Sequence, residues 1–531
     1  MQEIKYYELY TIGFSLSSTI ILKATNNRSK QRETALLAIK YTEIMTTDIQ
    51  QREVSDKPKQ FDKQDAFFFP PDKRSYGHQY REIYEARAKQ LKSRVMKMAS
   101  MKWKNETING EKAKYVNKLL DVKSMTPSYV IGTVFMDMKY KPNILREATG
   151  NIYAAPEFKD DSEYDELERT RIHSYSDPSS DQVMLEDESG RLLLDGELLD
   201  KVVLMTGVVI GALGMIVEAG VFTIVDVVYP EAAVQIPRSI EDKPEQFVMY
   251  LSGLRIKPSS KRASLEVLKE FIMGQLTNED NIGNLLKRTT NLVILGSSIE
   301  VTAKSQKDLS DKDKYRAMNK SNFDAQSLEI LDKWISDLLV SIPVSIMPGE
   351  TDPAEIEYPK MPFHKSLFRL SSGRRNFERL TNPAWLQIND DRILATSGEN
   401  VNDMFKYMIP NIHVEVGSGI DSPVRREILY DSRLKLLQSN ILWQNVAPTA
   451  PDTLPCYPFT GTDLFTLNET PHVYVVGCQP KFETTKLEMS RRNGEKLSVQ
   501  IISVPDFEQT GQCVFMNTKT LECTSARVVD Q

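Results

Sequence analysis

The sequence predicts two folded domains, a small β-barrel preceded by a long helix and then an α/β domain. The chain has 531 residues, which is long for one domain, and 40% of them are hydrophobic, enough for sizeable cores. Short apolar segments with closely spaced glycines occupy residues 129–228. From about residue 245, apolar strands alternate with amphipathic helices. We therefore expect an N-terminal extension at 1–66, a helix and barrel at 67–240, and an α/β domain at 245–531.

The extension shows no convincing targeting or membrane signal. Its apolar segment, Leu9 to Leu22, is shorter than the ~20 residues that a membrane-spanning helix needs. Glu3 and Glu8 spoil the basic start of a signal peptide. The polar stretch that follows Met45 is typical of disorder. We expect a partly disordered extension without a role in targeting.

A helix is predicted over residues 76–103. Apolar residues recur there at three- and four-residue steps and form one stripe: Tyr80, Tyr84, Leu91, Val95 and Met98. The opposite face carries Arg and Lys. Such a face can contact nucleic acid, but the whole chain is acidic, so a solvated helix surface is the preferred interpretation.

The barrel prediction depends on five strands and on the glycines among them. The expected strands are 129–138, 183–187, 191–194, 202–210 and 221–228. The glycines that permit sharp bends are Gly132, Gly190, Gly207, Gly211 and Gly214. This spacing is typical of an oligonucleotide/oligosaccharide-binding (OB) fold.

Charge and aromatic residues argue against a primary role in DNA binding. The net charge is −6 and the sequence pI is about 5.7, whereas nucleic-acid-binding domains are usually basic. Residues 157–181 carry nine acidic and three basic residues and would repel DNA. The aromatic residues Phe135, Phe222 and Tyr229 lie in apolar strands, where core packing is favoured over base stacking.

The α/β domain is predicted from six apolar strands and at least one amphipathic helix. The strands are 248–251, 292–295, 344–347, 393–396, 473–476 and 499–504. The helix covers 325–340, with Leu328, Leu331, Ile335 and Leu338 on one face. This core is complete without a cofactor, so none is expected.

Cysteine and histidine give no pattern of a metal site. The four cysteines include no Cys-x-x-Cys pair, and only five histidines are present. We expect His364 and His472 to be structural hydrogen-bonding residues. Asp352 and Asp403 are expected to cap helices or brace turns.

The segment 342–353, IPVSIMPGETDP, has the form of a ligand-binding loop at the end of a buried strand. It resembles the Pro-Gly-Asn-His-Asp/Glu loop of binuclear metallophosphoesterases, but Glu350 and Thr351 replace the amide and imidazole ligands. A two-metal hydrolase needs several carboxylates and imidazoles that converge from separate strand ends. This loop lacks two of its expected ligands.

The other strand ends resemble the remaining motifs of that family with the same losses. Matching the motifs Asp-x-His, Gly-Asp, a lone histidine and Gly-His-x-His in order places six further residues at ligand positions: Gly253, Arg255, Ser297, Ser397, Cys478 and Pro480. None of these eight positions holds a residue suited to the family's chemistry. We therefore expect a degenerate site with no catalytic residue and no metal.

A more specific resemblance extends over residues 67–531. The carrying segments are LEDESGR (185–191), IMPGETDP (346–353), TNP (381–383), SGENVNDM (397–404), WQNVAPTAPDTLPCYPF (443–459) and PHVYVVGCQP (471–480). They are similar to the small, or B, subunits of eukaryotic DNA polymerase delta, in a fungal version. The resemblance implies an OB barrel joined to an inactivated calcineurin-like phosphoesterase domain.

The same resemblance implies function and partners. It implies a nuclear, non-catalytic scaffold that binds the C-terminal metal-binding module of the catalytic subunit and also the third subunit. The sliding clamp would be reached through the third subunit, and yeasts would share the chain with polymerase zeta in translesion synthesis. Two alternatives remain open, an active phosphodiesterase or 3′–5′ exonuclease like archaeal relatives, and a single-stranded DNA-binding module. The residues of the partner interfaces are not predicted, and Trp443, Tyr457 and Phe459 fit either an interface or the core.

Overall fold

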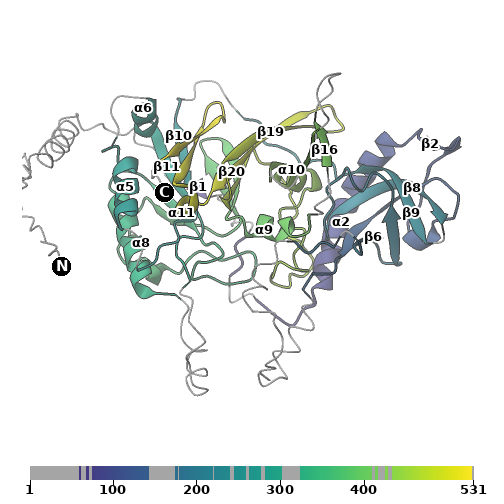
Figure 1. Cartoon of the computed structure of the whole chain (residues 1–531), viewed down its shortest axis with the longest axis horizontal. Helices are drawn as coiled ribbons and strands as arrows, with labels where there is room; N and C mark the ends of the chain where they lie inside the picture. The colour runs from purple at the N-terminus through teal and green to yellow at the C-terminus, as the bar shows by residue number, and fades with distance from the viewer. Residues whose placement is uncertain are drawn as a thin grey trace, which may run out of the picture.

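The fold is a barrel with a long helix beside a pair of stacked sheets (Figure 1). The computed structural model describes residues 59–60, 67–70, 74–142, 174–177, 179–218, 220–238, 244–258, 262–276, 281–301, 323–408, 413–416, 425–428 and 433–528. Most of the predicted extension and most of the acidic segment lie outside these residues. In the described part of the chain, no helix combines the length and apolarity needed to cross a membrane.

Helix α2 (Arg81–Lys102) confirms the predicted helix but begins later than expected. Its buried residues are Ile83, Ala86, Arg87, Leu91, Val95 and Ala99. Tyr80 is 48% exposed, so the predicted stripe is wrong at its N-terminal end. Burial of Arg87 was not predicted, because an arginine in a helical pattern is normally assigned to solvent.

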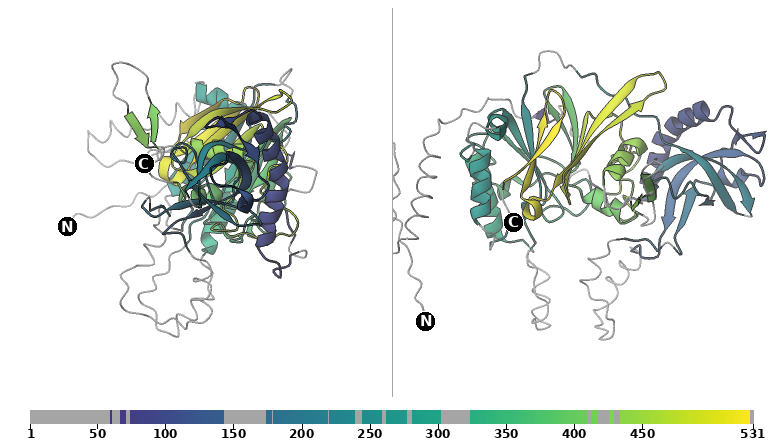
Figure 2. Two further views of the ribbon diagram at one scale, coloured as in Figure 1. Left: turned by 90° about the vertical axis from the view of Figure 1, so that its right-hand side faces the viewer. Right: turned by 45° about the horizontal axis from the view of Figure 1, so that its top comes forward.

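The barrel closes through five strands: β5 (Ser128–Asp137), β6 (Gln182–Glu186), β7 (Arg191–Asp195), β8 (Val209–Glu218) and β9 (Val221–Val228). The sheet order is β4-β5-β6-β7-β9-β8, with β4 at Lys114–Tyr115, and β5 also pairs with β8. Strands β7 and β9 pair in parallel. The pairs β5–β6, β5–β8 and β8–β9 are antiparallel. Closure leaves none of these five strands as a free edge, as the OB topology requires. Figure 2 shows the barrel end-on in its left view.

One strand prediction is wrong. Residues 202–208 precede β8 instead of forming it, although Val203, Leu204 and Met205 are buried as a strand would require. The break falls at Gly207, which has φ of 88°, a region that side-chain-bearing residues avoid. A continuous apolar run does not by itself distinguish a buried strand from a buried loop.

The α/β part contains two six-stranded sheets. The first has the order β13 (Phe377–Arg379), β12 (Val344–Met347), β11 (Thr289–Leu295), β10 (Phe247–Leu251), β21 (Gln512–Asn517), β22 (Cys523–Arg527). The second has the order β1 (Lys59–Gln60), β14 (Ala384–Ile388), β15 (Asp391–Thr396), β18 (Val473–Gln479), β20 (Lys496–Pro505), β19 (Glu483–Ser490). All six predicted strands are present.

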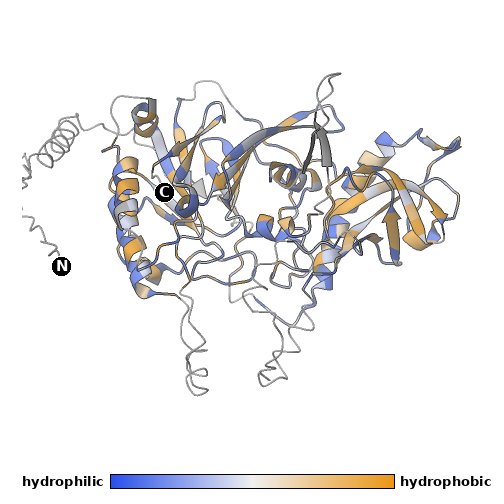
Figure 3. Ribbon diagram, viewed as in Figure 1, coloured by the Kyte–Doolittle hydropathy of each residue, from blue (hydrophilic) through white to orange (hydrophobic). Residues whose placement is uncertain are grey.

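The sheets stack through an apolar layer. Val293 and Leu295 of β11 face Val473 and Val475 of β18 in one buried cluster. Tyr474 and Val476, which alternate with the latter pair, point to the other side of the second sheet and join the barrel core. Strands buried on both faces explain the continuous apolar runs of the sequence. Figure 3 shows this concentration of hydrophobic residues in the strands.

Helices cover the outer faces of the stacked sheets. The first sheet packs against α5 (Arg262–Ile272) and α8 (Ala325–Leu338), and α6 (Asn281–Lys287) contributes Leu286 to the same cluster. The second sheet packs against α9 (Glu399–Phe405) and α10 (Leu434–Trp443), which lie between it and the barrel (Figures 1 and 2). The core of the α/β part is therefore continuous with that of the barrel.

A buried ion pair joins α2 to the α/β part. Arg87 and Asp463 are both 0% exposed, and Arg87 Nε donates to Asp463 Oδ2 at 2.8 Å. The remaining guanidinium donors reach the carbonyls of Pro448 at 2.7 Å, Ala450 at 2.8 Å and Gly207 at 3.3 Å. A Cβ on Gly207 would lie 2.0 Å from Pro448 O, so glycine is required for this contact. Arg87 thus ties the helix, the barrel and the 443–459 segment together.

Candidate functional site

The loops that follow β10, β11, β12, β15 and β18 meet at one end of the sheets, and they contain the residues that the sequence analysis singled out. A Cβ on Gly296 would lie 2.6 Å from Ser397 Cβ and 2.7 Å from Gly349 Cα. One on Gly477 would lie 3.1 Å from Ser252 Cβ. The loops therefore touch backbone to backbone, and glycine makes this close approach possible.

Some of the backbone in these loops has unusual conformation. Three of the eight non-glycine residues with positive φ in the described part of the chain lie here: Arg255 at 43°, Ser297 at 51° and Cys478 at 50°. Such conformations cost on the order of 1–3 kcal/mol each and cluster at active sites and ligand clamps. Each of the three is a position at which the sequence predicted a lost ligand, although no local pattern indicated the strain.

Asp352 joins the loop after β12 to the loop after β11. It is 2% exposed, and its carboxylate accepts from Gly349 N at 2.8 Å, Ser298 N at 2.8 Å and Ile299 N at 2.9 Å. Burial raises the pKa of Asp352 to about 6, while these hydrogen bonds and the charge of Lys360 act in the opposite direction. The prediction that Asp352 braces a turn is confirmed.

Lys360 and Glu399 form a second buried ion pair in this region. Lys360 Nζ lies 3.2 Å from Glu399 Oε2 and 3.4 Å from the carbonyl oxygen of Gly349. Burial raises the pKa of Glu399 to about 7, Lys360 lowers it and Glu350 raises it further. Glu399 begins α9, directly after the loop that contains Ser397.

Asn382 connects three of the loops. Its Nδ2 donates to Pro348 O at 2.9 Å and to Ser397 Oγ at 2.6 Å, and its Oδ1 accepts from Ser397 N at 3.1 Å and Tyr358 Oη at 3.2 Å. Ser397 Oγ also donates to Glu399 Oε1 at 3.3 Å. Ser397 is therefore a structural hydrogen-bonding residue.

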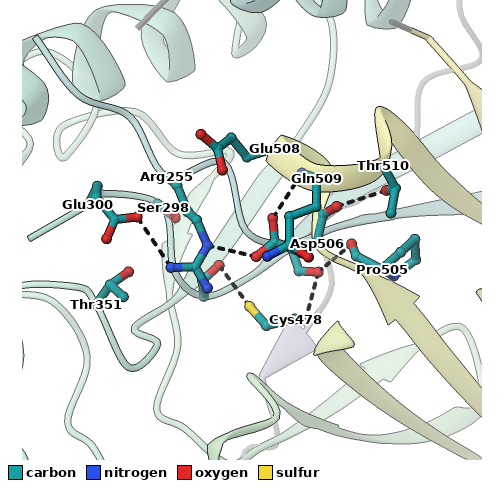
Figure 4. A network of polar contacts seen from close by, with 12 residues as sticks. Arg255, Ser298, Glu300, Thr351, Cys478, Pro505, Asp506, Glu508, Gln509 and Thr510 are labelled. Carbon is teal, nitrogen blue, oxygen red and sulfur yellow. Dashed lines mark hydrogen bonds and ion pairs between the residues drawn. The ribbon is translucent and has the colours of Figure 1, made fainter. Parts of the chain in front are cut away.

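Arg255 is held by two acids on the β10 side of the site (Figure 4). Its Nε donates to Asp506 Oδ2 at 2.7 Å, and its Nη1 lies 3.2 Å from Glu300 Oε2. These carboxylates, led by Asp506, raise the pKa of Arg255 against the opposing effect of burial. A Cβ on Gly253 would lie 2.4 Å from Asp506 Cγ, so the glycine leaves room for the acid.

The other predicted positions also have structural contacts or face solvent. Cys478 N donates to Ser252 Oγ at 2.8 Å, and Thr351 Oγ1 donates to Ile299 O at 2.6 Å. Glu350 and Pro480 are exposed. Six of the eight positions thus lie within the packed strand-end loops, and Glu350 and Pro480 lie exposed at their edge.

The residues present do not fit a two-metal centre. Within the described ranges, no group of three or more His, Cys, Asp or Glu side chains could hold a metal ion. His364 Nδ1 accepts from Ser366 N at 3.3 Å on the surface, and buried His472 accepts from Arg392 N at 2.9 Å. Both histidines are structural, as predicted.

Lys360, Asn382, Glu399 and Asp506 were not predicted as members of the site. Asn382 and Glu399 lie in the distinctive TNP and SGENVNDM segments, so they had a detectable signal. Lys360 and Asp506 had none, because their partners are distant in the sequence. The aromatic candidates Trp443, Tyr457 and Phe459 are at most 7% exposed and belong to the core.

Comparisons with known proteins agree with this architecture. The family model "DNA polymerase delta subunit OB-fold domain" matches residues 79–227, and the family model of the B subunits of DNA polymerase alpha/epsilon matches residues 248–484. The DNA polymerase delta small subunit of Saccharomyces cerevisiae is 36% identical over 88% of this chain and 93% of its own length. The corresponding Arabidopsis thaliana protein is 32% identical over 84% and 90%. DNA polymerase delta subunit 2 of Drosophila melanogaster is 29% identical over 84% and 93%. The chain therefore belongs to the family of DNA polymerase delta small subunits.

Proposed function

We propose that this chain is a non-catalytic accessory subunit of DNA polymerase delta, and that it scaffolds the complex. It binds the C-terminal metal-binding module of the catalytic subunit and, on a separate surface, the third subunit. The observation that carries the proposal is similarity to polymerase delta small subunits over nearly their whole length. The units that serve it are the helix and barrel of 67–240 and the α/β domain of 245–531. From the extension of 1–66, Lys59–Gln60 adds an edge strand to the second sheet.

The α/β domain, in this proposal, is a calcineurin-like phosphoesterase that has lost its chemistry. The loops still meet at the strand ends and keep strained backbone at Arg255, Ser297 and Cys478. Side chains at several ligand positions are engaged by other residues of the chain, as Arg255 is by Asp506. Without two ions, neither an attacking water nor a leaving oxygen is activated.

Purified protein is therefore expected to be hydrolytically inert. The assay measures cleavage of a phosphodiester and of single-stranded DNA in the presence of Mn²⁺, and no turnover above the buffer rate is expected. A cleavage activity that persists through repeated purification and disappears in Asp352→Ala protein would support the active phosphodiesterase or exonuclease instead.

We infer that Phe135 and Phe222, two of the aromatic residues in the described part of the barrel, do not serve base stacking. Phe135 is half-buried, and Lys141 Nζ and Arg191 Cζ lie 4.5 and 4.4 Å from the centre of its ring. Lys141 pairs with Asp452 at 2.5 Å, and Arg191 pairs with Glu186. The ring and the nearby cations are thus engaged within the protein, whereas base stacking requires accessible rings beside a basic groove. Phe222 is fully buried.

The cellular role follows from the same proposal. The chain acts in the nucleus, in processive replication and in repair synthesis, and touches DNA only as part of the assembled polymerase. The sliding clamp is reached through the third subunit. Sharing with the catalytic subunit of polymerase zeta, and hence a part in translesion synthesis, belongs to the proposal as well.

A further inference from the structure

The chain buries a lysine where the strand-end loops converge. The side chain of Lys360 is 4% exposed, and that of its partner Glu399 is 11% exposed. Lysine is rarely buried, because its compact ammonium group loses strong hydration and must then be compensated by nearby negative charge or dipoles. The groups around Lys360 Nζ therefore indicate how its positive charge is compensated.

The surroundings of Lys360 Nζ include oxygen atoms from two separate segments of the chain. Glu399 Oε2 lies 3.2 Å and Gly349 O 3.4 Å from Nζ, and the carboxylate of Asp352 interacts with Lys360 electrostatically. Carboxylates and a backbone carbonyl are the ligands that hard divalent cations take. The oxygens come from the loop after β12 and from the start of α9, which Asn382 holds together.

The other cation of the region cannot replace this one. Arg255 is already paired with Asp506 and Glu300 on the β10 side. The exposed carboxylate of Glu350 raises the pKa of Glu399. Lys360 has the opposite effect, because its positive charge lowers the pKa of both Glu399 and Asp352. Removing the ammonium group would therefore deprive both carboxylates of its compensating charge.

We propose that Lys360 is the built-in cation of this site: its ammonium group takes the place of a metal ion among the strand-end oxygens and keeps divalent cations out. The comparison with a metal ion rests on the proposed descent from a phosphoesterase, whereas the charge balance rests on the contacts of Lys360 alone. The proposal predicts that deleting the ammonium group together with its side-chain volume converts a lysine site into a divalent cation site.

The test uses the full chain and thermal unfolding at pH 8, above the pKa of about 7 for Glu399 and about 6 for Asp352 in the native chain, after removal of metals with a chelator. Three variants are compared with the native chain: Lys360→Ala, Lys360→Met and the double variant Lys360→Ala/Glu399→Gln. Mn²⁺ is added as the probe, and its binding is measured in parallel by calorimetry. Alanine leaves space for an ion, methionine fills that space, and the double variant removes a ligand.

We expect a Tm of the native chain that changes by less than about 1 °C with Mn²⁺. The Lys360→Ala chain should have a lowered Tm that Mn²⁺ at about 100-fold its Kd raises by about 2–3 °C, as expected for binding of one ion to a chain of this size. Lys360→Met should be destabilised without rescue, and the double variant should lose the rescue. Arg81→Ala, which changes an exposed residue of α2 and leaves Lys360 in place, is the control and should show no gain with Mn²⁺.

Three results would overturn the inference: a folded Lys360→Ala chain that neither binds Mn²⁺ nor is stabilised by it, saturable stabilisation of the native chain by Mn²⁺ that depends on Glu399, or a Lys360→Met chain as stable as the native one. If Lys360→Ala does not fold, Lys360→Met and Lys360→Met/Glu399→Gln decide the question. A Tm of Lys360→Met/Glu399→Gln that is higher than the Tm of Lys360→Met supports the inference, because neither residue is then charged. An equal or lower Tm contradicts it. These readouts involve neither hydrolysis nor polymerase subunits, so they fail independently of the proposed function.

Discussion

Replacement of Arg87 by alanine is expected to lower the free energy of unfolding by about 3–5 kcal/mol, the usual cost of breaking a buried ion pair by removing one partner. The change leaves Asp463 buried without its cation and the carbonyls of Pro448 and Ala450 without their donor. Asn445 Nδ2 and Thr466 Oγ1 still donate to Asp463, at 3.0 and 2.9 Å, and compensate only part of its charge.

The measurement is the midpoint of denaturant unfolding, followed by a probe in the barrel and one in the sheets. Arg81→Ala on the same helix is the matched control. Arg81 is exposed and pairs with Glu85 four residues on, so its loss should change stability by no more than about 0.5 kcal/mol. Equal midpoints for Arg87→Ala and Arg81→Ala would show that the buried pair does not hold the two parts together.

Replacement of Asp352 by alanine is the second large effect, with an expected loss of about 3–5 kcal/mol. It leaves three buried backbone N–H groups, those of Gly349, Ser298 and Ile299, without an acceptor, and each orphaned group costs on the order of 1–3 kcal/mol before relaxation. The loops after β11 and β12 would separate, and water would enter between them.

Glu350→Ala is the control for Asp352→Ala, because it removes a carboxylate from the same loop that is exposed and braces no neighbouring loop. Its stability should stay within about 0.5 kcal/mol of the native value. The measurements are thermal unfolding of both variants and hydrogen exchange of the amides of Ser298 and Ile299. They show whether Asp352, but not Glu350, stabilises these loops. Native-like protection of these amides in Asp352→Ala would mean that Asp352 is not their essential acceptor.

The strands of the α/β part were predictable because they are buried on both faces. Val344–Met347 is a strand over the predicted residues, and Val473–Gln479 extends its prediction by three residues. The same signal failed before β8, where Val203 to Met205 are buried in a loop that turns at Gly207. An apolar run indicates that a segment is buried. Only the backbone geometry shows whether that buried segment is a strand or a loop.

The residues of the candidate site lie near one another because they follow strands directly, and parallel strand ends meet at one edge of a sheet. The ion pairs of the site could not be predicted from the sequence. Arg255 and Asp506 are 251 residues apart in the sequence, and Arg87 and Asp463 are 376 residues apart. The local sequence around a charged residue predicts that the residue is exposed. Whether it is buried depends on ion-pair partners that are distant in the sequence and close only in the folded chain.

The central claim is that this chain is a scaffold, and co-purification tests it most directly. The native chain is co-expressed with the C-terminal metal-binding module of the polymerase delta catalytic subunit, with the N-terminal region of the third subunit, and with both, and each mixture is analysed by size-exclusion chromatography. We predict stable binary complexes and a ternary complex, since permanent partners typically bury more than about 2,000 Å². Failure to co-elute with the catalytic module, by a chain that is folded and monodisperse alone, would contradict the account.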